Sequence, residues 1–118
     1  MSNPINIIDN KKQIELSVGS YSLKVLGGWK VIINNFSLVL REVDGKLEIK
    51  PKNTSWRTQS FRFGKRAKTI ASINITKKAK YEIIFHNVNE LKVKKSNLMS
   101  LSYFQNFIPT KKVQVCIE

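Results

Sequence analysis

The chain has 118 residues, with 21 Lys and Arg against 8 Asp and Glu, a formal net charge of +13. A hydrophobic fraction of 42% excludes an intrinsically disordered chain, and the lone Cys116 excludes an intramolecular disulfide or a multi-thiolate metal site. No run of about 18 apolar residues occurs, so we predict no transmembrane segment. The length predicts a single domain over residues 1–118.

Apolar and polar residues alternate along most of the chain, which is typical of half-buried strands. In chain order, the expected strands cover residues 13–18, 21–25, 38–43, 47–49, 61–63, 73–75, 81–86, 91–94 and 113–117. Turn-forming residues separate them, among them Gly19-Ser20, Asn34-Asn35 and Lys77-Lys78. Only the residues from Ser96 to Phe104 have room for a helical turn.

The dipeptide Asp44-Gly45 is the sharpest turn signal. It predicts a hairpin over Arg41 to Ile49 with a two-residue loop, in which Gly45 takes a positive φ. On that basis Gly45→Val should cost about 1 kcal/mol or more.

Short strands separated by frequent turns predict an all-β protein. We expect a two-sheet antiparallel jelly-roll-like β-sandwich, with a small OB-like β-barrel as the alternative. The residues expected in its core are Leu23, Val25, Phe61, Phe63, Ile73, Ile75, Tyr81, Ile83 and Phe85.

The positive charge is concentrated in one stretch. From Ile49 to Tyr81 there is no acidic residue, whereas the residues from Met1 to Glu48 are nearly balanced. The stretch contains ten cations: Lys50, Lys52, Arg57, Arg62, Lys65, Arg66, Lys68, Lys77, Lys78 and Lys80. Because consecutive strands usually lie close in space, we expect these cations to form a continuous positive surface.

Two segments are candidates for contacting an anion. Aromatic and basic residues are interleaved from Trp56 to Arg66, as in proteins that stack nucleobases on rings, although the favoured explanation is a core strand with Phe61 and Phe63 inward. Lys92 and Lys94 share one face of a strand, for which a solvated edge is the favoured explanation and a patch for lipid headgroups or acidic glycans the alternative. The anion-binding candidates are Arg57, Arg62, Lys65, Arg66, Lys68, Lys92 and Lys94, with Trp56 as the stacking candidate.

Catalytic and metal-binding patterns are missing from the sequence. His86 is the only histidine, at the outward end of its strand, and Cys116 stands thirty positions away with no orienting motif. Gly27-Gly28 lacks the spacing and the Lys of a phosphate-binding loop. We therefore expect no enzymatic activity, no cofactor and no metal.

The segment from Ile73 to Asn87, followed by Leu91 to Val93, resembles a pattern of GOLD-like and related jelly-roll domains. A strand enters a short turn, and a strand that begins with a tyrosine, Tyr81, returns and ends in Phe85-His86-Asn87 before a further strand. The resemblance implies a jelly-roll fold and a binding or adaptor module, without catalytic residues.

The function expected from the sequence is a non-enzymatic interaction module with a basic surface for an anionic partner. A membrane surface, an acidic polysaccharide and an acidic protein all fit, and the alternative is a β-barrel that binds single-stranded nucleic acid. The partner expected is thus an unidentified anion, and both nucleic acid and peripheral membrane contact are compatible with the basic surface. The expected location is extracytoplasmic if a signal or anchor precedes this segment, and cytoplasmic otherwise.

Overall fold

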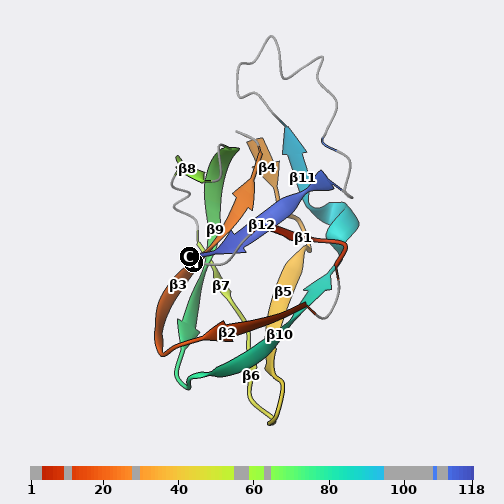
Figure 1. Cartoon of the computed structure of the whole chain (residues 1–118). Coiled ribbons are helices and arrows are strands. Elements are labelled where there is room, and N and C mark those ends of the chain that lie inside the picture. Colours follow the sequence, from red (N-terminus) through yellow and green to blue (C-terminus); the bar gives the residue numbers. More distant parts are fainter. Residues whose placement is uncertain are drawn as a thin grey trace.

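The computed structural model describes residues 4–9, 12–27, 30–54, 59–62, 65–94, 108 and 112–118. Of residues 30, 59–62, 65 and 94 it describes the backbone alone. These residues form antiparallel β-structure with one short 3-10 helix, η1 (Val88–Glu90), as Figure 1 shows.

The strands are arranged in three sheets. The largest has the order β1 (Ile5–Asn6), β12 (Gln114–Ile117), β3 (Gly19–Leu26), β9 (Lys65–Ile75) and β7 (Lys52–Asn53), and β8 (Gln59–Arg62) also pairs with β9. The second has the order β2 (Lys12–Leu16), β10 (Ala79–His86), β5 (Ser37–Glu42) and β6 (Glu48–Ile49). The third pairs β11 (Lys92–Lys94) with β4 (Lys30–Ile32). All pairings are antiparallel.

This arrangement confirms the predicted all-β, sandwich-like fold. The strands of the described residues do not close into a barrel, so the OB-like alternative is not supported. The third, two-stranded sheet was not expected, because a sequence pattern gives strands but not their partners.

The largest and the second sheet are connected at a corner, where the chain passes from β2 into β3 and from β9 into β10. The pairing of β3 with β9 ends at Gly19 and Ile75, and the pairing of β2 with β10 begins at Leu16 and Ala79. The chain turns between them at residues 17–18 and 76–78, at the lower end of Figure 1. The predicted turn at Gly19-Ser20 is therefore displaced, since both residues belong to β3.

Each turn of this corner is held by a tyrosine four residues further along the chain. The Tyr21 hydroxyl donates to the Ser17 carbonyl oxygen at 3.0 Å, and the Tyr81 hydroxyl donates to the Lys77 carbonyl oxygen at 2.5 Å. Such tyrosine corners are a recurrent feature of antiparallel sandwiches, because the ring packs in the core while the hydroxyl fixes the backbone of the turn.

A second corner joins β5 and β10 to β4 and β11. Asn34 and Asn87 adopt left-handed φ values of 48° and 56°, which asparagine tolerates better than most residues. The Asn87 amide donates to the Asn35 carbonyl oxygen at 3.0 Å. The predicted turn at Asn34-Asn35 is confirmed.

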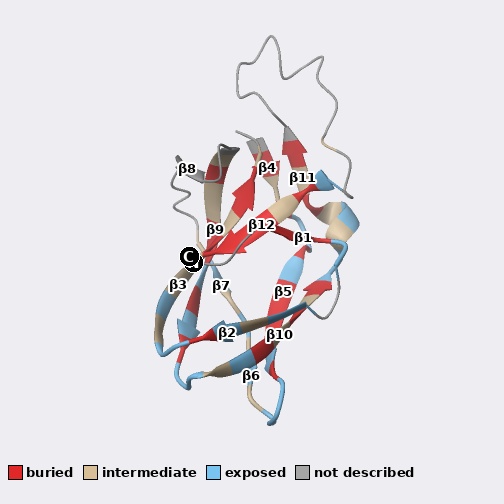
Figure 2. Ribbon diagram, in the orientation of Figure 1, coloured by how far each residue is buried: buried red, intermediate tan, exposed pale blue. Residues whose placement is uncertain are grey.

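The core lies between the sheets and contains most of the predicted residues (Figure 2). The confirmed residues, all at most 6% exposed, are Leu23, Val25, Ile73, Ile75, Tyr81, Ile83 and Phe85. The predicted burial of Phe61 and Phe63, and the helical turn expected within Ser96 to Phe104, lie outside the described side chains and residues. Val18, the last residue of the strand expected over residues 13–18, is instead 65% exposed because it lies in the turn between β2 and β3.

The hairpin from Arg41 to Ile49 is confirmed, but its loop is longer than predicted. Leu40 faces Ile49 in the pairing of β5 with β6, and the Glu42 amide donates to the Leu47 carbonyl oxygen at 2.8 Å. The loop runs from Val43 to Lys46, and Gly45 does not have a positive φ. The prediction that Gly45 is needed for a positive φ in a two-residue loop is therefore wrong.

Candidate anion-binding site

The acid-free stretch folds into β7, β8, β9 and the corner before β10. Because β9 has 11 residues and a strand rises about 3.4 Å per residue, its two ends lie roughly 35 Å apart. The described cations of this stretch are thus distributed along the length of the largest sheet. They fall into three groups: near the start of β9, beside its middle at β7, and at the β9–β10 corner.

A β-bulge in β9 places two of its cations, Arg66 and Lys68, on the core side of the sheet. The register between β3 and β9 shifts after Leu23, so Lys68 comes to lie opposite Val25, which is fully buried. Directly opposed residues share a face of the sheet. Arg66, two positions earlier, shares that face, and both cations are half-buried and engaged with other groups. These two candidates therefore do not lie on the outer face of the sheet, to which the Lys52 side chain points.

The cations beside the middle of β9 line an open groove. Lys50 and Lys52 border it on one side, and Ser20, Ser72 and Asn74 on the other, around a volume of about 370 Å³. We call it the Lys50–Lys52 groove. All five of these residues are exposed, Ile73 in its floor is buried, and none of its described lining residues is acidic.

Strand register brings these residues together from distant parts of the sequence. Lys52 lies opposite Ser72, and Ser20 lies opposite Asn74, so these side chains point to the outer face of the largest sheet. None of the five polar side chains makes a hydrogen bond or ion pair with the described part of the chain. The groove thus presents two ammonium groups, two hydroxyls and one amide to solvent.

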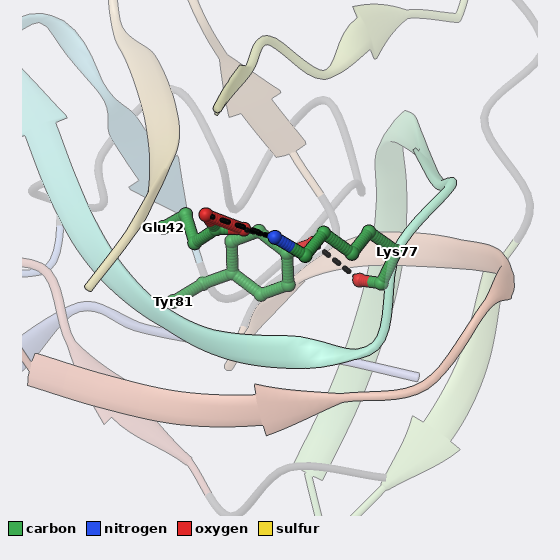
Figure 3. Close-up of polar contacts among 3 residues, drawn as sticks. All are labelled: Glu42, Lys77 and Tyr81. Atoms are coloured by element: carbon green, nitrogen blue, oxygen red, sulfur yellow. Dashed lines mark hydrogen bonds and ion pairs between the residues drawn. The ribbon is translucent and has the colours of Figure 1, made fainter. Parts of the chain in front are cut away.

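At the β9–β10 corner, Lys77 is neutralised by a buried carboxylate, as Figure 3 shows. Its Nζ lies 2.9 Å from Glu42 Oε2 and donates a hydrogen bond to Oε1 at 3.3 Å. The Glu42 side chain is only 7% exposed. Nothing in the sequence predicted this pair, because its members are 35 residues apart and only the fold places them together.

Glu42 contributes to a raised pKa at two neighbouring residues, Lys77 and Tyr81. The hydrogen bond to Glu42, and then its charge, raise the pKa of Lys77. Burial, and then the charge of Glu42, raise the pKa of Tyr81. Both groups therefore hold their protons more tightly in the folded protein than in the unfolded chain.

This predicts a loss of stability at alkaline pH. A group with a raised folded-state pKa stabilises fully below its unfolded pKa, about 10 for Tyr and Lys, and loses that contribution as pH rises through its folded pKa. We expect the unfolding free energy to fall above about pH 10, and to fall less steeply in Tyr81→Phe. A spectroscopic titration should show Tyr81, identified as the signal that is missing in Tyr81→Phe, ionising at higher pH in the folded protein than in the unfolded chain. Ionisation of Tyr81 at the same pH in both states would contradict this.

The remaining predicted site residues are only partly described. Trp56 and Arg57 lie outside the described residues; Arg62 lies in β8, Lys65 in β9 and Lys94 in β11, without described side chains. Lys92 is half-buried opposite Ile32. The structure therefore does not bring the candidate set together as one described site.

The residues considered for catalysis lie apart. His86 is exposed at the end of β10, opposite Ser37, as its outward phase predicted. Cys116 alternates along β12 with the core residues Val115 and Ile117, yet it is fully buried as well, with Leu26 and Ala67 in a small second cluster. Within the described ranges, no three His, Cys, Asp or Glu side chains gather at a potential metal site.

No family model, curated protein or solved structure matches this chain. No helix in the described part of the chain has the length and hydropathy needed to cross a bilayer.

Proposed function

We propose that this chain is a non-enzymatic binding module that contacts an anionic partner through the Lys50–Lys52 groove. The observation that carries the proposal is the groove itself, where two exposed lysines lie beside hydroxyl and amide groups that the described part of the fold does not use, and where no described lining residue is acidic. A net charge of +13 adds long-range attraction for anions and speeds their association. The GOLD-like resemblance of Ile73 to Asn87 belongs to the same proposal, since it implies a binding module.

The proposal predicts salt-sensitive binding of polyanions that depends on where the lysines are. Heparin, anionic lipid vesicles and a thymidine oligonucleotide should bind at about 50 mM salt and much more weakly at about 200 mM. The double variant Lys50→Ser/Lys52→Ser should weaken binding by about tenfold, as expected for two lost charge-assisted contacts. Titration calorimetry and vesicle co-sedimentation measure these affinities.

A charge-matched control separates a site from a general charge effect. Lys12→Ser/Lys112→Ser removes the same charge from two exposed lysines outside the groove. We expect this control to lose much less affinity than the groove variant. Equal losses would mean that no specific surface is used, and absence of binding at low salt would refute the proposal.

The nucleic-acid alternative has its own signature. A stacking aromatic contributes about 1–3 kcal/mol per base, largely independently of salt. If Trp56→Ala weakens oligonucleotide binding by that amount while heparin binding is unchanged, the protein is a single-strand binder.

A further inference from the structure

The Lys50–Lys52 groove contains more hydrogen-bonding capacity than the fold uses. The hydroxyls of Ser20 and Ser72 and the amide of Asn74 are exposed on two adjacent strands, and none bonds to the described part of the protein. Each hydroxyl can donate and accept, and the amide offers two donors and an acceptor. This set matches a ligand that carries several hydroxyl groups beside its negative charge.

The lining also argues against two other anionic partners. None of the described lining residues is aromatic, so the groove offers no platform on which a nucleobase could stack. Among the described residues, the large apolar side chains that are exposed, Ile8, Val18 and Val43, do not line the groove. Its own apolar residues are Ile49, which is half-buried, and Ile73, which is buried, so the groove offers no fully exposed large apolar side chain for insertion into a bilayer.

Both ammonium groups of the groove come from one segment of the chain, so they can contact the same side of a bound oxyanion. Lys50 and Lys52 belong to the link that leaves β6 and enters β7, and they face the row formed by Ser72 and Asn74. Lysine acts as a flexible point charge, so it can follow a sulfate or carboxylate group without a fixed bidentate geometry. The volume of about 370 Å³ lies within the range of sites for small ligands, roughly 300–1,000 Å³.

We infer that the Lys50–Lys52 groove binds an acidic saccharide, with the two lysines on its sulfate or carboxylate group and Ser20, Ser72 and Asn74 on its ring hydroxyls. This inference rests on the proposed function, because it names the ligand class of the same groove. It goes further in assigning part of the affinity to uncharged groups.

The test uses a variant that leaves the charge unchanged. In Ser72→Ala/Asn74→Ala, the affinity for a heparin tetrasaccharide or a galacturonate tetrasaccharide should fall by about tenfold, the effect of one or two lost hydrogen bonds. Binding of anionic vesicles and of the thymidine oligonucleotide should not change. The matched control Ser37→Ala/Asn89→Ala removes an exposed hydroxyl and an exposed amide outside the groove, and should bind all ligands as the parent does.

The outcomes separate this inference from the proposed function. Preference for the heparin fragment assigns a sulfated saccharide, and preference for galacturonate a uronic one; either supports the inference if it is lost in Ser72→Ala/Asn74→Ala. If polyanions bind through the lysines but the neutral variant binds both saccharides unchanged, the inference is overturned and the proposed function stands. If no polyanion binds at low salt, both are overturned. Thermal unfolding of each variant confirms that a loss of affinity is not a loss of fold.

Discussion

Phe85→Ala is expected to lower the free energy of unfolding by about 3–5 kcal/mol, the range measured for large-to-small changes at buried aromatic positions. Phe85 is 6% exposed, and its ring stacks on that of Phe36 with 6.2 Å between centroids and 23° between planes. The truncation therefore removes buried apolar area, an aromatic contact and the packing of the corner where β10 ends. A loss of this size is comparable to the whole stability of many domains.

The neighbouring residue provides the control. His86 is exposed and lies next in the same strand, so His86→Ala should change the unfolding free energy by less than about 0.5 kcal/mol. Chemical denaturation of both variants decides the matter. Equal midpoints for the two would show that Phe85 does not belong to the core.

The period-two pattern predicted the inner face of the sandwich correctly because alternation fixes which residues share a face. It worked for Leu23, Val25 and Ile83, which lie in long regular strands. It failed at two positions: Val18 lies in the turn between β2 and β3, and Cys116 is buried with Leu26 and Ala67 although it alternates with the core residues of β12. Where a strand turns, and what covers its other face, depend on distant segments of the chain, so a local sequence pattern does not predict them.

The positions of the charged residues could not be predicted from the sequence either, because they depend on how the strands pair. The sequence identified the acid-free stretch, but the bulge in β9 places Lys68 on the core side while Lys52 remains on the outer side. The groove needs residues from three segments whose register is set by pairing, and the ion pair of Glu42 with Lys77 joins the end of β5 to the turn before β10. Composition therefore predicted attraction for anions, whereas the location of the candidate site required the fold.

Gly45→Ala is expected to destabilise the protein, against the usual sign of this substitution. At a position without positive φ, alanine normally stabilises by about 0.4–1 kcal/mol because it restricts the unfolded chain. Here a Cβ on residue 45 would overlap the Glu42 carboxylate, with the Glu42 Cδ at only 2.6 Å. The carboxylate is buried and bound to Lys77, so moving it disrupts that pair, and overpacking of this kind costs about 1–3 kcal/mol. Gly45→Val should cost more.

A double-mutant cycle separates this steric cause from backbone strain. In a Glu42→Ala background the space beside Gly45 is vacated, so adding Gly45→Ala should become neutral or stabilising by about 0.4–1 kcal/mol. Strain from the backbone would instead cost the same in both backgrounds, since removing the Glu42 side chain does not change φ at residue 45. Denaturant unfolding of the four proteins of the cycle measures the coupling. A coupling energy near zero would show that the loop needs glycine for its conformation, whereas a coupling of about 1 kcal/mol or more would show that the glycine makes room for the buried carboxylate.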